Sequence, residues 1–228
     1  MNVELLADED AVAKRAAAFL AAAAREAVAA RGKFVVAVSG GKTPWQMLRE
    51  LANETVPWSQ VQIVQVDERV APDGDPSRNL THLKESLLSH APLKPEQIHA
   101  MPVGDADLEA AAARYAATLA TVAGAPPVID LVHLGLGPDG HTASLTPGDA
   151  VLEVRDRDVA PTAGLYQGQR RLTLTYPILD RARQVMWVVT GASKRTAMAQ
   201  LLKSDPAIPA GRVRPQAATL FADRAAAG

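Results

Sequence analysis

Residues 139–144 read DGHTAS and belong to a glycine-rich loop that follows an apolar run. An imidazole titrates near neutral pH, which suits His141 to transfer protons in catalysis. Because this histidine lies in a tight glycine loop, we predict that the backbone holds it in place. Either Asp139 or Asp67 could orient the imidazole or stabilise its protonated form. The alternative interpretation is that Asp139 caps the next helix and His141 is a turn residue.

A second segment with chemical potential is SGGKT at residues 39–43, here called the SGGKT loop. Consecutive N–H groups of Ser39, Gly40 and Gly41 can form an anion cradle. Glycine reaches the positive φ values that such a nest needs, and a following helix adds positive potential. Thr43 can add a hydroxyl group. A loop of this size fits the single phosphate of a monoester.

Charged residues provide further candidates. Asp67, Glu68 and Arg69 come directly after the apolar run 61–66. Arg69 could use its fixed fork of donors to bind an oxyanion, although neighbouring opposite charges also form structural ion pairs. Arg171 and Lys194 could neutralise a bound phosphate, and the alternative for both is a solvated surface charge.

The elements that must position these residues alternate between strands and helices. Strands are predicted at 34–38, 61–66, 128–134, 171–175 and 185–190. Several are apolar almost throughout, which is typical of parallel strands covered on both faces. Helices are predicted up to Gly32 and at 44–53, 78–90, 105–123 and 193–203. The order predicts an α/β fold with a Rossmann-like open, mostly parallel sheet and helices on both faces, as one domain over residues 1–228.

The loops after the strands carry most of the chemistry. Ligands of open α/β sheets bind beyond the carboxyl ends of the strands. The segments SGGKTP, DER, GLGPDGHTAS and GASK each follow a predicted strand, so we expect them to meet at one edge of the sheet. His133 lies inside an apolar run and is expected to be a core residue.

Several familiar motifs are only partly matched. A P-loop would need glycine where Val36 stands, and Pro44 replaces a residue that should donate an N–H. Residues 135–140 match G-x-G-x-x-G, but Asp139 would repel a pyrophosphate. The serine nucleophile elbow lacks its leading glycine, because Ala37 stands there. The five histidines show no HExxH spacing and cysteine is absent, so we predict neither a metal nor a cofactor.

Composition restricts the partners. The 228 residues carry a formal net charge of −1 with no long basic run, so neither nucleic acid nor a membrane is expected as a partner. The alanine-rich stretch 16–24 follows acidic residues, where a signal peptide would carry basic ones, and we predict a surface helix there. The expectation is a cytoplasmic protein that is a monomer or a weak homo-oligomer.

In order along the chain, SGGKTP, DER with Ser-Arg-Asn at 77–79, GLGPDGHTASL, RRLTLT and GASK resemble the 6-phosphogluconolactonase family over residues 30–205. Related glucosamine-6-phosphate deaminases have the same Rossmann-like fold and share the SGG, Asp-Glu and DGH segments. Their DGH is typically followed by Ile-Ala-Phe-Asn-Glu-Pro, which supplies an acid. Here residues 142–147 read TASLTP and supply none. This difference favours the lactonase.

The resemblance implies hydrolysis of 6-phospho-D-glucono-1,5-lactone to 6-phosphogluconate in the oxidative pentose phosphate pathway. The partner is then a small phosphosugar lactone, and no cofactor is needed. By position, the SGGKT loop, Arg171 and Lys194 would bind the 6-phosphate and the sugar.

The resemblance also implies the roles of the remaining candidates. His141 would be the general base that activates water against the lactone carbonyl and then protonates the leaving ring oxygen. Arg69 and loop N–H groups would stabilise the developing oxyanion, and Asp67 or Asp139 would position His141.

Two alternatives remain at this stage. One is an amino-sugar-phosphate deaminase or isomerase on the same fold. The other is a non-catalytic sugar-phosphate-sensing domain, which would normally carry a DNA-binding module. The N-terminal helix is too short and too rich in alanine to be such a module.

Overall fold

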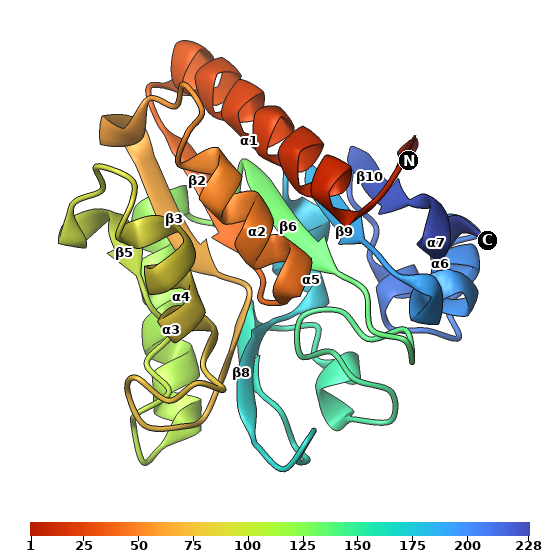
Figure 1. Ribbon diagram of the computed structural model, residues 1–228. Helices are drawn as coiled ribbons and strands as arrows, with labels where there is room; N and C mark the ends of the chain where they lie inside the picture. The colour runs from red at the N-terminus through yellow and green to blue at the C-terminus, as the bar shows by residue number, and fades with distance from the viewer.

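The computed structural model describes residues 1–228, which form an open α/β sheet with helices on both faces, as predicted (Figure 1). Seven strands have the order β1-β10-β9-β6-β2-β3-β5, and every neighbouring pair is parallel. Their bounds are β1 (Asn2–Leu6), β2 (Phe34–Val38), β3 (Val61–Gln65), β5 (Ile98–His99), β6 (Leu131–Gly135), β9 (Val185–Val189) and β10 (Ala218–Asp223).

The helices flank this sheet in two layers. Their bounds are α1 (Glu9–Arg31), α2 (Lys42–Leu51), α3 (Asn79–Leu83) with a π turn at Lys84–Leu88, α4 (Leu108–Ala123), α5 (Tyr176–Arg181), α6 (Arg195–Leu202) and α7 (Arg224–Ala227). Short 3₁₀ turns lie at Trp58–Gln60, Pro95–Gln97, Ala150–Glu153, Ala192–Lys194 and Ala210–Arg212. Helix α1 ends at Gly32, whose φ of 73° forms a left-handed cap, as the sequence predicted.

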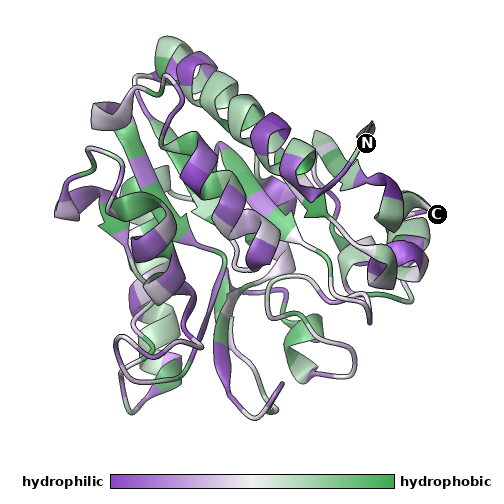
Figure 2. Ribbon diagram, viewed as in Figure 1, coloured by the Kyte–Doolittle hydropathy of each residue, from purple (hydrophilic) through white to green (hydrophobic).

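Two apolar cores, one on each face of the sheet, hold the layers together. Strand β2 is buried along its whole length and contributes side chains to both cores. Val35 and Ala37 pack with α4, α5 and α6, whereas Phe34, Val36 and Val38 pack with α1, α2 and α3. Figure 2 shows the apolar strands between helices whose hydrophilic residues face outward. The nearly continuous apolar runs in the sequence are therefore explained by burial on both faces.

A second, three-stranded antiparallel sheet with the order β4-β8-β7 corrects one prediction. Its strands are β4 (Asp67–Arg69), β7 (Val159–Pro161) and β8 (Arg171–Leu174). The predicted strand at 171–175 exists as β8, but it pairs with β4 and β7 and not with the parallel sheet. In its register, Asp67 lies opposite Thr173 and Arg69 lies opposite Arg171. This small sheet brings the acid and both arginines together.

Smaller differences concern boundaries and missed strands. Helix α2 begins at Lys42, so Pro44 occupies its third position and not its first. The helix predicted at 78–90 changes to a π turn after Leu83. Strands β1 and β10 were not predicted, although β10 lies between β1 and β9 and is almost entirely buried. None of the helices has the length and apolar character required to cross a membrane.

Candidate active site

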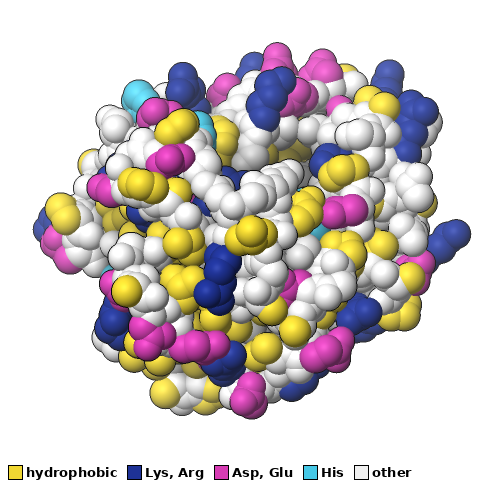
Figure 3. Space-filling model, turned by 90° about the horizontal axis from the view of Figure 1, so that it is seen from below, with side chains coloured by type: hydrophobic (Ala, Val, Ile, Leu, Met, Phe, Trp, Pro, Cys, Tyr) yellow, Lys and Arg dark blue, Asp and Glu magenta, His cyan; other side chains and the backbone are white.

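A cleft of about 460 Å³ opens beyond the carboxyl ends of β2, β6 and β9. Loops from both sheets line it, so the predicted meeting of the strand ends is confirmed. The predicted residues that line it are Ser39, Gly40, Gly41, Thr43, Asp67, Arg69, His141, Arg171 and Lys194. Asp139 does not line the cleft but contacts His141. Figure 3, seen from below, shows basic and acidic side chains interspersed, with no continuous patch of one sign on this face.

His141 and Asp139 form a close pair in the loop between β6 and the 3₁₀ turn at Ala150–Glu153. His141 Nδ1 lies 2.6 Å from Asp139 Oδ1, which also accepts the His141 backbone N–H at 3.1 Å. A carboxylate only accepts hydrogen bonds, so Nδ1 carries the proton. The lone pair of a neutral His141 is therefore on Nε2. That tautomer leaves Nε2 free to accept a proton from another molecule.

The loop backbone leaves room for this pair. A Cβ atom on Gly137 would lie 1.9 Å from His141 Nδ1 and 2.6 Å from Asp139 Oδ1, so only glycine fits there. The Gly137 N–H donates to the His141 carbonyl at 2.8 Å. No helix follows, because Thr142 and Leu145 close a tight turn in which Ala143 has a φ of 51°. The alternative interpretation of Asp139 as a helix cap is therefore wrong.

Hydrogen bonds keep Asp139 ionised. Partial burial on its own would raise the pKa of the carboxyl. The hydrogen bonds from the His141 side chain and backbone, with a further one from Tyr166, outweigh this effect, and the pKa is lowered below its ordinary value. The carboxylate is therefore available at neutral pH to orient the imidazole.

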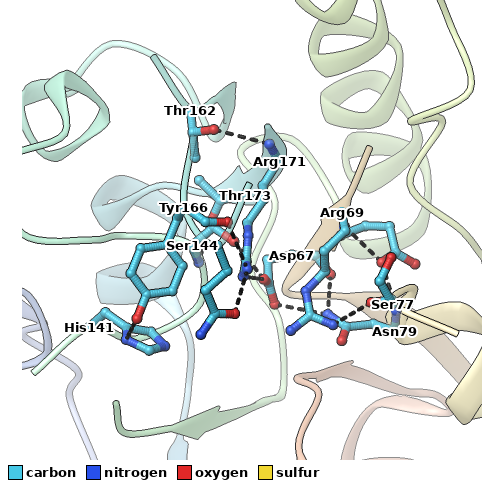
Figure 4. A network of polar contacts seen from close by, with 12 residues as sticks. Asp67, Arg69, Ser77, Asn79, His141, Ser144, Thr162, Tyr166, Arg171 and Thr173 are labelled. Atoms are coloured by element: carbon cyan, nitrogen blue, oxygen red, sulfur yellow. Dashed lines mark hydrogen bonds and ion pairs between the residues drawn. The ribbon is translucent and has the colours of Figure 1, made fainter. Parts of the chain in front are cut away.

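Asp67 has other partners, so the structure decides which acid contacts the histidine. Its Oδ2 accepts the Ser144 hydroxyl at 2.6 Å, and its Oδ1 and carbonyl accept the Asn79 amide at 3.3 and 3.0 Å. Arg171 Nη1 lies 4.0 Å from Asp67 Oδ2. Figure 4 shows Asp67 between Arg171 and Arg69, on the side of Arg171 away from His141.

The SGGKT loop differs from the prediction at its first residue. The Ser39 N–H donates to His133 Nδ1 at 3.2 Å, away from the cleft, so it cannot belong to an anion cradle. His133 is fully buried, as predicted, and burial lowers its pKa to about 3. The neutral ring accepts at Nδ1 and therefore carries its proton on Nε2, which has no hydrogen-bond partner.

The anion-binding groups that remain are at the start of α2. The N–H groups in the first turn of α2 have no hydrogen-bond partner within the helix and point out of its N-terminal end. This turn contains no acidic residue. The Thr43 hydroxyl is otherwise engaged: it donates to Glu9 Oε1 at 3.0 Å and lies 2.6 Å from the Thr190 hydroxyl. Thr43 therefore offers its backbone N–H to the cleft and not its hydroxyl proton. Lys42 Nζ is 3.1 Å from Glu9 Oε2 and highly exposed.

Two arginines from the antiparallel sheet reach the cleft. Arg69 Nη1 donates to the Ser77 carbonyl at 2.6 Å, which fixes one end of its guanidinium. Arg171 is buried, and its Nη2 donates weakly to Tyr166 and Gln167 at 3.4 and 3.3 Å. The Nε atoms of both arginines are buried without a partner in the chain. The two guanidinium groups thus retain donor capacity.

The charges around the cleft favour an anionic ligand. Its carboxylates are already paired: Asp223, for example, accepts the N–H groups of Gly191 and Ala226. Lys194 lines the same cleft without an ion pair. Burial lowers the pKa of its amine, and Asp139 partly opposes this effect. No group of three or more His, Asp or Glu side chains is arranged to hold a metal ion.

Sequence reasoning missed several residues of the cleft. Tyr166 touches both His141 and Asp139, yet it lies in a loop without a recognisable motif. Glu9 comes from the first turn of α1, far away in the sequence. Asn79 also lines the cleft, and its position next to Arg78 was the available signal; Ser144 lies behind the cleft, hydrogen-bonded to Asp67.

Comparison with known proteins identifies the family of the chain. The family described as glucosamine-6-phosphate isomerases/6-phosphogluconolactonase matches residues 7–222. A 6-phosphogluconolactonase of Nostoc sp. is 36% identical over 100% of this chain and 97% of its own. The human 6-phosphogluconolactonase is 34% identical over 95% of this chain and 85% of its own. The chain belongs to the glucosamine-6-phosphate isomerase/6-phosphogluconolactonase family.

Solved structures give the same result for the fold. A 6-phosphogluconolactonase from Thermotoga maritima superposes with a TM-score of 0.88 and 26% identity, covering 98% of this chain and 99% of that one. A monomeric glucosamine-6-phosphate deaminase superposes with a TM-score of 0.85 at 21% identity, covering 100% and 99% of the two chains. The fold alone thus does not separate the two chemistries.

Proposed function

We propose that this protein hydrolyses 6-phospho-D-glucono-1,5-lactone to 6-phospho-D-gluconate in the oxidative pentose phosphate pathway. The observation that carries the proposal is the His141–Asp139 pair, with Nδ1 and Oδ1 2.6 Å apart, in the same cleft as an acid-free helix N-terminus. A proton-transfer group and an anion site together suit a phosphorylated substrate with a hydrolysable ester.

In this proposal, the phosphate binds at the SGGKT loop. Backbone N–H groups from Gly40 to Thr43 donate to its oxygens, and Lys194 neutralises part of its charge. Arg171 and Arg69 donate from the opposite sheet to the sugar or to the lactone carbonyl oxygen. Because the carboxylates around the cleft are already paired, the lysine and the two arginines are the charged groups that attract an anion.

The chemical step uses His141 twice. Nε2 takes a proton from water while the water oxygen attacks the lactone carbonyl carbon, and Asp139 stabilises the imidazolium that forms. Donors of Arg69 and the loops stabilise the negative charge on the carbonyl oxygen. The bond between this carbon and the ring oxygen then breaks, and the imidazolium returns its proton to the ring oxygen. The product acid ionises, so one proton is released to solvent for each turnover.

The competing chemistry is isomerisation of an amino sugar phosphate, as in the deaminase that shares the fold. That family places an acid after DGH, whereas residues 142–147 contain none. Here Thr142 and Leu145 close a tight turn, and the Ser144 hydroxyl donates a hydrogen bond to Asp67. This arrangement supports hydrolysis over isomerisation.

The test is to follow acid release from freshly generated 6-phosphogluconolactone above the spontaneous rate, in parallel with ammonia release from glucosamine 6-phosphate. We expect acid release to accelerate and ammonia to stay at background. Ammonia release without lactone hydrolysis would establish the deaminase. Tight binding of either sugar phosphate without turnover would indicate a sensor domain.

A further inference from the structure

Tyr166 lies at the tip of the hairpin between β7 and β8, and the tip is held in place. Tyr166 and Gln169 exchange backbone hydrogen bonds across a two-residue turn. The turn residues Gln167 and Gly168 have φ values of 54° and 79°, which match the twist of a hairpin. Asp149 accepts the N–H groups before the tip, at residues 163 and 164, at 3.1 and 2.9 Å.

The tyrosine hydroxyl touches both members of the acid–base pair. It lies 3.2 Å from Asp139 Oδ2 and 3.2 Å from His141 Nδ1. Because Nδ1 carries a proton, the hydroxyl must donate to Asp139 and can only accept from His141. Both oxygens of the carboxylate are then hydrogen-bonded, one to the imidazole and one to the phenol. Two fixed oxygens determine the plane of the carboxylate and with it the direction of the imidazole.

The tyrosine ring has a second contact surface. The Arg171 guanidinium carbon lies 5.0 Å from the ring centroid, within the range of a cation–π contact. On another side, the His141 ring meets it edge-on at 5.1 Å between centroids. Figure 4 shows Tyr166 between His141 and Arg171. One side chain therefore connects His141, in the loop after β6 of the parallel sheet, with Arg171 of the antiparallel sheet.

We propose that Tyr166 is a positioning residue that couples the His141–Asp139 pair to Arg171, the arginine that binds the substrate in the proposed function. Its hydroxyl fixes Asp139 so that His141 Nε2 faces the cleft, and its ring supports the Arg171 guanidinium. This inference rests on the proposed lactone hydrolysis and adds a residue to it. It predicts that the two parts of the side chain affect different kinetic constants.

The first test is Tyr166→Phe, which removes the hydroxyl and keeps the ring. We expect kcat to fall about tenfold, the order of effect expected for one lost hydrogen bond, with KM changed less than about twofold. Because the hydroxyl contacts both members of the pair, we expect the acid limb of the pH–rate profile to differ from that of wild type.

The other charged groups near the pair should not obscure that shift. Lys194 and Asp139 interact electrostatically, and the Arg171 guanidinium faces the tyrosine ring. Asp67 and Arg69 act on Arg171 from the antiparallel sheet. All four remain in the Phe variant, so a change in the profile reports on the hydroxyl.

The second test is Tyr166→Leu, which also removes the ring. We expect the kcat effect of the Phe variant plus an increase in KM of about fivefold, because Arg171 loses its stacked partner. Tyr176→Phe is the matched control. Tyr176 has a hydroxyl bonded to the Pro209 carbonyl at 3.0 Å and Arg155 over its ring at 5.0 Å, but it lies outside the cleft. Leu165→Ala tests the exposed neighbour on the same hairpin tip.

The outcomes separate this inference from the proposed function. NMR titration of the His141 imidazole in wild type and Tyr166→Phe requires no turnover, and we expect its midpoint to differ between the two proteins. An unchanged midpoint, or a Phe variant with wild-type kcat, overturns the role of Tyr166. If the NMR midpoint moves while wild type does not hydrolyse the lactone, the coupling stands and the proposed function fails. If kcat falls equally in the Tyr176 and Leu165 controls, the loss reflects general destabilisation of the protein, and the inference is overturned.

Discussion

The two sheets of this molecule contribute to the cleft in different ways. The seven-stranded parallel sheet supplies loops after its strands: the SGGKT loop, the His141 loop and the segment with Lys194. The three-stranded antiparallel sheet supplies side chains from within its strands, because Asp67, Arg69 and Arg171 all belong to β4 or β8. One sheet contributes backbone donors and the His141–Asp139 pair, and the other contributes charged side chains that are buried or half-buried.

This difference shows how a common fold can be adapted to one substrate. Loops after parallel strands can change without disturbing the core, and they carry the chemistry. The antiparallel sheet forms a wall in which alternate residues face the cleft, so each charge is fixed by the strand register. We therefore expect changes in the His141 loop to reduce kcat, and changes at Arg171 in the wall to raise KM.

Apart from removal of His141 itself, the largest expected effect in this comparison comes from Gly137→Ala. The added methyl group would collide with His141 Nδ1 and Asp139 Oδ1, so the pair must move. Displacement of a catalytic group by about 1 Å can cost about 10²-fold in rate, and we expect kcat to fall by that order. Gly104→Ala is the control, since a Cβ there meets nothing within 4 Å. A folded Gly137→Ala protein with more than half of the wild-type kcat would contradict the role of this loop.

Arg171→Met tests the antiparallel wall. A hydrogen bond to a charged group contributes about 1.5–3 kcal/mol, so we expect KM for the phosphorylated lactone to rise by about 10- to 100-fold with a smaller change in kcat. Arg170→Met is the matched control. Arg170 donates to the Thr162 carbonyl at 3.2 Å and does not line the cleft. If kcat falls and KM stays constant, the division of roles between the sheets is wrong.

The smallest expected effect concerns His133, beneath the SGGKT loop. Its folded pKa of about 3 is far below the ordinary value of 6.5, so below pH 6.5 the unfolded chain binds a proton that the folded chain rejects. Stability from this group is complete above pH 6.5 and is lost as the pH falls. When the pH is lowered from 6.5 to 5, the free energy of unfolding should therefore fall by about 2 kcal/mol more in wild type than in His133→Met. Urea denaturation at both pH values measures this, and parallel pH dependences would contradict it.

The same contrast explains how much the sequence could predict. Strand β2 was predicted with its observed bounds, because a strand buried on both faces gives an uninterrupted apolar run. The strands β4 and β7 are only three residues long and contain charge or proline, so no periodicity identifies them. Strand β10 lies beyond GASK and the helix that follows it, and its short apolar stretch did not distinguish a strand from other structure.

At the site, residue types were more predictable than their contacts. His141 and the SGGKT loop followed from glycine spacing at strand ends. The choice between Asp139 and Asp67 depended on side-chain directions, which only the folded loop determines. The Ser39 N–H turned inward because His133 Nδ1 accepts it across two adjacent strands. Tyr166 could not be found, since its role arises where two hairpin residues with positive φ turn it toward the cleft.

The most direct test of the account compares wild type with His141→Ala in hydrolysis of 6-phosphogluconolactone, followed by acid release and corrected for spontaneous opening. His141→Ala removes the proposed base but leaves the SGGKT loop, Arg171 and Lys194 in place. We predict a loss of about 10²- to 10⁴-fold in kcat, with binding of the product 6-phosphogluconate largely retained. A folded His141→Ala protein that hydrolyses the lactone at the wild-type rate would contradict the central claim.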